Sequence, residues 1–289
     1  MAQSLMTLLF TGLLLLAQTL GINTGTERKS VNDLVAAFND LRATFLEPEG
    51  DGTLEQAETA DQTARQTAAG LQHLTLGQGE VWETTYYVVD SGIEGPTVMV
   101  VAGLHGDEPA ALLAGQELIE EVQAITRGKV ILVPEANAEA IEARKRAVDA
   151  DLNRVFPIEA VRGESPSPKA PAAAAVWSLV EEHRPDWLID LHDESSDVTG
   201  QTVIFHEAHE ESAWAAEALA NQLNATLAES DTPFRTASGP PSGSLARAAS
   251  ELFDVRTLTL ETHRRHSLSA RAGWLSGGVT YLLTYLGML

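Results

Sequence analysis

Apolar runs alternate with stretches of helical periodicity along most of this chain. The apolar runs predict strands over 80–91, 96–102, 129–134, 186–192, 201–205 and 255–261. Between and after them, apolar residues recur at helical spacing and predict helices over 108–125, 138–147, 211–229, 243–253 and 268–288, with a further helix that ends near His183. Strands that alternate with helices are typical of a mostly parallel sheet with helices on both faces, so the sequence predicts an α/β domain over 76–289.

The first residues have a different pattern. LMTLLFTGLLLLA, at 5–17, is short for a membrane span and has the length of the apolar core of a signal peptide. No lysine or arginine precedes it, and no clean A-x-A cleavage site follows it. We expect 1–24 to be a signal peptide or membrane anchor, which would export the protein (periplasmic or extracellular) or tether it to a membrane through 5–17. A cytoplasmic protein is the alternative.

Residues 25–75 are polar and acidic, and they predict a helical extension ahead of the α/β domain. Within it, EPEGDGTLEQAE at 47–58 resembles the calcium-binding loop of an EF-hand, with glycine at its sixth position. Glutamate stands at two positions where aspartate is usual, and no second hand accompanies the loop. An acidic helix–turn–helix is therefore the favoured interpretation. The alternative is a weak calcium site with the ligands Glu47, Glu49, Asp51 and Glu58.

Composition excludes several classes of function. The chain carries 41 acidic against 19 basic residues, a net charge of −22, which would repel the phosphates of a nucleic acid. It has no cysteine, so disulfides, thiolate metal sites and cysteine nucleophiles are excluded. With 44% hydrophobic residues over 289 positions, it can bury the core of one full-sized domain.

Polar residues stand at the ends of three predicted strands, where ligands bind in open α/β sheets. GLHGDE supplies His105 and Glu108, DLH supplies His192, and TLE supplies Glu261. Two histidines and one glutamate are a common zinc-ligand set in hydrolases, with the fourth position left to water. We therefore expect one zinc ion per chain on the first three residues, and Glu261 as the carboxylate that takes the proton of the water. Asp190 precedes His192 by two residues, and we expect it on the opposite face of the strand, as a supporting carboxylate rather than a ligand.

A charged segment, RAVDADLNRVFP, lies between these strand ends in the sequence. The guanidinium of Arg154 can hold a carboxylate in bidentate fashion, and Asn153 can add a hydrogen bond to the same group. Arg146 can polarise a carbonyl and stabilise an oxyanion. A charged surface loop is the alternative interpretation.

Taken together, H-x-x-E, R-x-x-D-x-D-L-N-R-x-F, D-L-H and T-x-E resemble the zinc carboxypeptidase superfamily, and within it the succinylglutamate desuccinylase/aspartoacylase branch. The resemblance covers about 80–288. It implies a mixed, mostly parallel eight-stranded sheet between helices. It also implies roles for seven residues: His105, Glu108 and His192 as zinc ligands, Glu261 as general base, Arg146 on the scissile carbonyl, and Asn153 with Arg154 on the substrate carboxylate.

The sequence also departs from its relatives. The 28 residues after Glu261 do not match the extra C-terminal β domain usual in this branch, so we expect a more open pocket. No tyrosine lies between Tyr87 and Tyr281, where peptide-cleaving carboxypeptidases usually place one over the substrate.

The predicted function is a zinc-dependent hydrolase that cleaves an amide bond near a substrate carboxylate. An N-acyl amino acid deacylase is the favoured form, with a small acylated amino acid or short peptide as substrate. The alternative is a metallocarboxypeptidase or amidase acting on small or cell-wall peptides. A non-catalytic binding module is a third interpretation, and the presence of Glu261 beside all three expected ligands argues against it.

Overall fold

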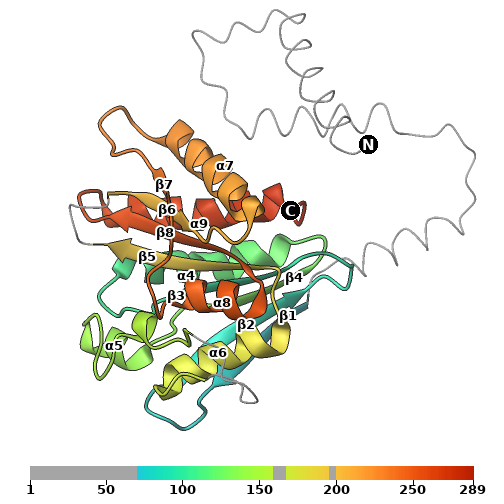
Figure 1. Ribbon diagram of the computed structural model, residues 1–289, viewed down its shortest axis with the longest axis vertical. Coiled ribbons are helices and arrows are strands. Elements are labelled where there is room, and N and C mark those ends of the chain that lie inside the picture. Colours follow the sequence, from blue (N-terminus) through green and yellow to red (C-terminus); the bar gives the residue numbers. More distant parts are fainter. Residues whose placement is uncertain (1–69, 159–166, 195–199) are drawn as a thin grey trace, which may run out of the picture. The chain divides into compact units, whose positions relative to one another are not determined.

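The computed structural model describes residues 70–158, 167–194 and 200–289, which form a single sheet with helices on both faces (Figure 1). The strand order is β1-β2-β4-β3-β5-β8-β6-β7. The apolar segment 5–17, the EF-hand-like loop at 47–58 and the extension before residue 70 lie outside the described residues. Every helix within the described ranges is too short or too polar to cross a lipid bilayer.

The sheet is mixed and mostly parallel. Its core strands β4, β3, β5 and β8 run parallel to one another. β2 and β6 run antiparallel to the outer members of that group, and β1 and β7 form the two edges. The strands are β1 (Gly70–Leu76), β2 (Thr84–Asp90), β3 (Thr97–Ala102), β4 (Lys129–Val133), β5 (Trp187–Glu194), β6 (Thr202–Phe205), β7 (Arg235–Ser238) and β8 (Arg256–His263). This confirms the α/β class and the eight-stranded mixed sheet predicted from the sequence.

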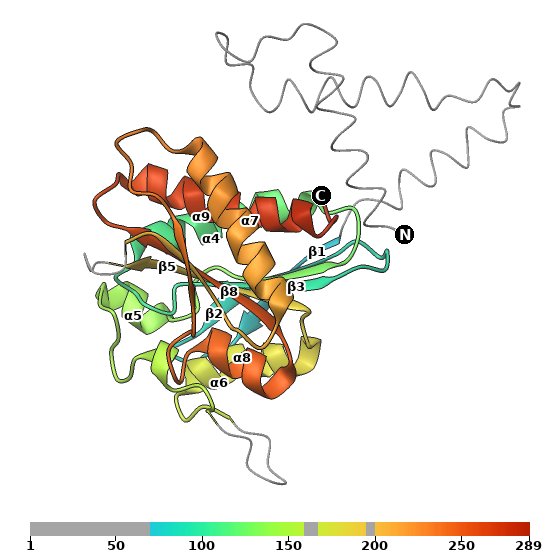
Figure 2. The same ribbon diagram turned by 45° about the horizontal axis from the view of Figure 1, so that its top comes forward.

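Helices cover both faces of the sheet, as Figure 2 shows. α4, α7 and α9 pack on one face, and α6 and α8 pack on the other. The helices are α4 (Pro109–Glu121), α5 (Ala138–Ala143), α6 (Pro171–His183), α7 (Glu210–Thr226), α8 (Leu245–Phe253) and α9 (Leu268–Tyr285), with 3-10 turns η1 (Val122–Ala124) and η2 (Leu152–Arg154).

The central strands are apolar on both sides because helices cover both faces. In β3, Val98 and Val100 belong to the core under α4 and α9, whereas Met99 and Val101 belong to the core under α6 and α8. The second core is built around the fully buried Trp177, whose ring stacks on Phe253 at 5.0 Å between centroids. A strand buried on both faces gives a continuous apolar run, which explains why these elements could be predicted.

Three expectations about the elements were wrong. Residues 70–75 were expected to belong to the helical extension, yet Gly70–Leu76 is the edge strand β1. Its side chains are mostly exposed, so its sequence lacks the apolar alternation of a half-buried strand. The opposite edge strand, β7, is fully exposed and was not predicted for the same reason. The helix expected over 138–147 is shorter, because α5 ends at Ala143 and Arg144 adopts a left-handed conformation with φ of 52°.

The loop after β3 is held closely against α5. Gly103 has a φ of +73°, which turns the chain away from the strand. A Cβ atom at Gly106 would lie 2.0 Å from the carbonyl group of Ala140 in α5. His105 lies in this loop, between Gly103 and Gly106. The contact with α5 therefore fixes the position of a candidate metal ligand relative to the sheet.

Candidate active site

Two histidine rings converge on one carboxylate at the carboxyl edge of the sheet. His105 Nδ1 lies 2.7 Å from Glu108 Oε1, and His192 Nδ1 lies 2.9 Å from Glu108 Oε2. Each of the three residues is no more than 2% exposed. Glu108 is the N-cap residue of α4, but its side chain makes no cap hydrogen bond and is directed to the histidines instead.

The cluster fits a metal ion by its donor set. Ligand atoms of His105, Glu108 and His192 all lie within 4.8 Å of one another. The other ring nitrogen of each histidine faces a second carboxylate, at 3.0 Å for Asp151 Oδ1 and 2.9 Å for Asp190 Oδ2. In metal sites such an outer carboxylate fixes the tautomer and leaves the opposite nitrogen available to the metal. Two imidazoles and one carboxylate suit zinc, and they accept other divalent metals as well.

The position of Asp190 differs from the one expected. We placed it on the opposite face of β5 from His192, whereas the two side chains are in contact. Side chains two residues apart on a strand point to the same face, so the contact is the normal outcome and the expectation was wrong. Its interpretation as a supporting carboxylate agrees with this contact.

Carboxylates dominate the electrostatics of the cluster. Burial alone lowers the pKa of His192, but the charges of Asp190, Glu108 and Glu261 outweigh it and hold that pKa well above its usual value. Burial also lowers the pKa of His105, and hydrogen bonds to its two carboxylate partners outweigh it and raise the pKa. The two histidines hold the pKa of Glu108 well below its usual range in spite of burial. The cluster therefore favours positive charge at its centre, as protons or as a metal cation.

Asn153 connects the charged segment to this cluster. It lies in the 3-10 turn η2, which begins where Asp151 Oδ1 accepts a hydrogen bond from the Asn153 backbone N–H at 3.0 Å. The side-chain Nδ2 donates to Asp190 Oδ2 at 3.2 Å, and Oδ1 accepts from the backbone N–H of Leu245 at 2.9 Å. Both ends of the amide are thus bonded to protein groups.

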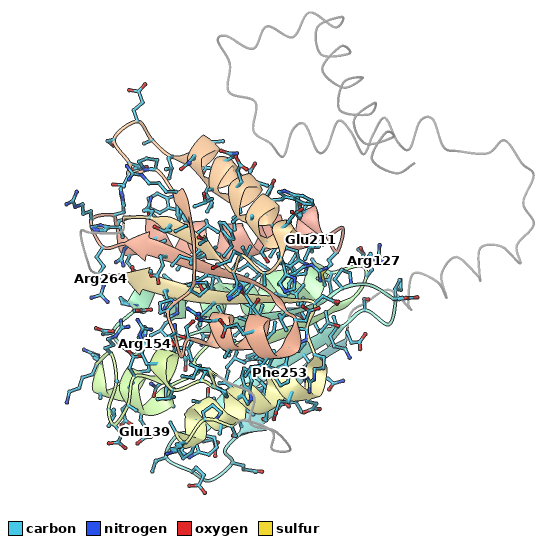
Figure 3. The ribbon with its side chains drawn as sticks, in the orientation of Figure 1. Arg127, Glu139, Arg154, Glu211, Phe253 and Arg264 are labelled. Carbon is cyan, nitrogen blue, oxygen red and sulfur yellow. The ribbon has the colours of Figure 1, made fainter. Side chains whose placement is uncertain are left out.

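Arg146 and Arg154 approach the cluster from the same segment. Arg146 Nε donates to Asp151 Oδ2 at 3.1 Å, and its Nη1 lies 3.7 Å from Glu108 Oε1. Arg154 Nη1 donates to the carbonyl oxygen of Asn153 at 2.6 Å, and no carboxylate of the described part of the chain pairs with its guanidinium. In Figure 3, Arg154 lies at the end of the sheet towards which β5 points, far from Arg127 at the opposite end.

A cavity of about 310 Å³ brings all seven predicted residues together. They are His105, Glu108, Arg146, Asn153, Arg154, His192 and Glu261. Their individual roles remain predictions. The cavity wall also contains eight further residues: Thr202, Ile204, Arg235, Thr236, Ala237, Pro241, Ser244 and Thr259.

Behind the cluster lies an ion-pair network that sequence reasoning also missed. The fully buried Asp193 forms an ion pair with Arg271 of α9, and its Oδ2 accepts from the backbone N–H of Ala110 at 3.3 Å. Its own backbone N–H donates to Glu108 Oε2 at 3.2 Å. The network therefore caps α4 and orients Glu108 from the side opposite the cavity. The register that places Asp193 beside Thr262 of β8 is a property of the fold, and no local pattern reveals it.

Comparisons with known proteins agree with this fold. The model of the succinylglutamate desuccinylase/aspartoacylase catalytic domain matches residues 94–272. The chain belongs to this family of hydrolases. It is also 34% identical over 103 residues to an N-alpha-acetyl-L-2,4-diaminobutyric acid deacetylase of Halomonas elongata. That match covers 34% of the chain and 29% of the relative, so it spans less than a third of the length of the relative.

Solved structures share the fold. The product-bound cell shape determinant Csd4 of Helicobacter pylori matches with a TM-score of 0.58 at 19% identity, over 68% of the chain and 52% of Csd4. A succinylglutamate desuccinylase/aspartoacylase of Rhodobacter sphaeroides matches with a TM-score of 0.55 at 21% identity, over 76% of the chain and 65% of that protein. A succinylglutamate desuccinylase of Silicibacter sp. TM1040 matches with a TM-score of 0.56 at 19% identity, over 76% of the chain and 68% of that protein.

Proposed function

We propose that this protein is a zinc-dependent hydrolase that cleaves an amide bond close to a substrate carboxylate, and that it acts as an N-acyl amino acid deacylase. The observation that carries the proposal is the buried His105–Glu108–His192 cluster, which shares its cavity with Glu261. The family match and the deacetylase relative support the same reaction class.

The three clustered residues would hold the zinc ion, because they offer two imidazole nitrogens and one carboxylate within 4.8 Å. Zinc bound there would lower the pKa of a bound water to about 7 and polarise a carbonyl oxygen. Asp151 contacts Nε2 of His105, and Asp190 contacts Nε2 of His192. These contacts keep both imidazole rings in the orientation that zinc binding requires.

Glu261 performs the proton transfers in this proposal. It stands on β8 directly beside His192 on the neighbouring strand, and it lines the cavity without belonging to the cluster of ligands. Its carboxylate can take a proton from the attacking water and deliver it to the leaving nitrogen, which converts a poor amide leaving group into an amine.

Arg146 stabilises the oxyanion. Its guanidinium lies 3.7 Å from a Glu108 oxygen, and 43% of its side chain is exposed, so it can follow the carbonyl as negative charge develops. A positive group aimed at that oxygen stabilises the transition state more than the substrate.

Arg154 makes the main contact with the substrate carboxylate. It lines the cavity without a carboxylate partner among the described residues, and its planar fork suits bidentate binding. Asn153 already holds Asp190 and Leu245 with its amide, so it serves chiefly to position the turn that carries Arg154.

A substrate panel tests the proposed function. Release of amine would be measured for N-acetylated neutral and acidic amino acids, N-succinyl amino acids, and short peptides with free or blocked C-termini, each with zinc and with a chelator. We expect turnover of acylated amino acids that the chelator abolishes and zinc restores. Turnover of peptides alone, only with a free C-terminus, would transfer the protein to the carboxypeptidases. Stoichiometric zinc binding without turnover of any substrate would contradict the proposal and favour a binding module.

A further inference from the structure

A second cavity, which we call the back cavity, borders the segment that carries three of the predicted site residues. Its volume is about 510 Å³, and among the described residues it shares none of its wall with the active-site cavity. Four parts of the fold enclose it: the loop between β1 and β2, the N-terminal end of α5, the charged segment before α6 and the N-terminal end of α6. Trp82, Asn137, Leu152 and Ala172 represent these four parts in its wall.

The turn η2 contributes to both cavities. Asn153 and Arg154 line the active-site cavity, whereas Leu152 and Val155, on either side of them in the sequence, line the back cavity. The turn is closed by a hydrogen bond from the backbone N–H of Val155 to the carbonyl oxygen of Leu152 at 3.4 Å. A ligand that displaces Leu152 in the back cavity therefore moves Asn153 and Arg154 as well.

Asn137 gives the back cavity a second connection to the active site. It is buried, and its side-chain Nδ2 donates to the carbonyl oxygen of Leu104 at 3.1 Å. Its backbone N–H donates to the carbonyl oxygen of Gly103 at 3.0 Å. Leu104 directly precedes His105 in the sequence, so one wall residue of the back cavity holds the loop that carries a candidate metal ligand.

The wall of the back cavity offers apolar surface to a ligand. Val81 is 77% exposed and Val148 is 50% exposed, although both are aliphatic. The half-buried Trp82 lies beside them in the sequence or in the wall. A ligand with an apolar body would remove this surface from water, which favours binding.

The charge of the same wall selects a cation. Glu80, Glu139 (labelled in Figure 3) and Asp149 face a single basic residue, Lys169. Within the described ranges, no lysine, arginine or histidine forms an ion pair with any of these three carboxylates. The negative charge of the wall is therefore uncompensated, and it attracts a positively charged group.

We propose that the back cavity is a second binding site, which takes a small organic cation with an apolar body, and that its occupation is coupled to the metal site. Its volume lies in the range of about 300–1,000 Å³ that is usual for small-molecule sites. Coupling follows if the ligand prefers one arrangement of η2 or of Asn137 over another, because both also contact the active site. The inference rests on the proposed function only through the zinc ion.

Calorimetry with two probes of similar shape tests the binding site. Phenethylammonium carries an ammonium group on an apolar body, and 2-phenylethanol is its neutral counterpart. We expect the zinc-loaded protein to bind phenethylammonium about fivefold more tightly than 2-phenylethanol, and the Glu139→Gln/Asp149→Asn variant to lose this preference, as expected for two exposed charges. Equal binding of both probes by the wild type, or no binding of either, would overturn the inference.

Glu217→Gln/Glu229→Gln is the matched control. It removes the same charge at two exposed positions, on α7 and just after it, and α7 packs on the face of the sheet opposite to α6. We expect this variant to bind both probes as the wild type does. If it loses the preference for phenethylammonium to the same extent as Glu139→Gln/Asp149→Asn, the probe responds to net charge alone and the proposed site is wrong.

The coupling is measured by binding, without a substrate. The zinc affinity of the wild type would be determined by competition with a chelator, with and without saturating phenethylammonium. We expect it to change about fivefold, and the affinity for the probe must change by the same factor on zinc binding. The change should vanish in Glu139→Gln/Asp149→Asn, which excludes direct binding of the amine to zinc. An unchanged zinc affinity in the wild type would overturn the inference, whereas a lack of turnover in the substrate panel would affect the proposed function alone.

Discussion

Asn153 joins separate parts of the fold, because its side-chain amide bonds to Asp190 of β5 and to the backbone of Leu245 in α8. The motif suggested an amide that binds the substrate, yet Nδ2 and Oδ1 both bond to protein groups. Its neighbour Arg154 is exposed and uncompensated. We therefore expect two adjacent residues of one motif to differ in role: Asn153 bonds to other parts of the protein, and Arg154 is the proposed contact with the substrate.

Substitution of these two neighbours by alanine should therefore have different effects. Asn153→Ala leaves the buried Asp190 carboxylate and the Leu245 N–H with one partner fewer, so we expect the free energy of unfolding to fall by about 1–3 kcal/mol. Arg154→Ala removes an exposed side chain and should change stability by no more than about 0.5 kcal/mol, but it should raise KM. Urea denaturation and steady-state kinetics on both variants check this. A stable Asn153→Ala with a raised KM alone would reassign Asn153 to substrate binding.

At the same scale, the sequence could predict the seven site residues because each is a polar residue at the end of an apolar run or within a dense charged motif. Arg235 and Asp193 could not be predicted in that way. Arg235 belongs to a short exposed strand with no pattern of its own, and Asp193 gains its role from Arg271, which is 78 residues away. Contacts of that kind arise from strand register and helix docking.

At the scale of elements, burial decided which strands were predictable. β3 is buried on both faces and gives a plain apolar run, whereas the edge strands β1 and β7 expose their side chains and resemble loops in the sequence. The end of α5 was also missed. Glycine usually marks a helix end with a left-handed residue, but here that residue is Arg144. The element boundaries thus depended on tertiary contacts that local patterns do not contain.

The contact between the loop after β3 and α5 gives a prediction at this scale. In Gly106→Ala, the new Cβ atom would meet the carbonyl group of Ala140 at 2.0 Å, so the loop that carries His105 must move. We expect the variant to lose about 1–3 kcal/mol of stability from overpacking and to bind zinc more weakly than the wild type. Thermal denaturation and competition with a zinc chelator measure the two effects.

Gly277→Ala is the matched control for that experiment. A Cβ atom at Gly277, in α9, would have no neighbour within 4 Å. Replacing glycine by alanine inside a helix stabilises it by about 0.5–1 kcal/mol, so the same chemical change should have the opposite sign there. Wild-type stability and zinc affinity in Gly106→Ala would show that the loop is not held against α5 as described.

On the scale of the whole molecule, three distant segments each supply one part of the site. The loop after β3 brings His105 and Glu108, β5 brings His192, and β8 brings Glu261. Because β3, β5 and β8 are parallel, their carboxyl ends meet at one edge of the sheet. The α/β pattern was therefore sufficient to predict a common site. The apolar segment 5–17 and the EF-hand-like loop at 47–58 lie outside the described residues, so what was expected of them stays an expectation.

The most direct test of the central claim separates zinc binding from proton transfer. Zinc content and kcat would be measured on the same preparations of the wild type and of two variants, Glu261→Gln and Glu211→Gln. Glu211→Gln is the control for loss of one carboxylate, because Glu211 is an exposed residue at the start of α7. We expect Glu261→Gln to retain one zinc ion per chain and to lose at least about 100-fold in kcat, as general acid–base catalysis predicts. The control should match the wild type in both measurements. A Glu261→Gln enzyme with full zinc content and wild-type kcat would contradict the account, because the proton would then be carried by another group.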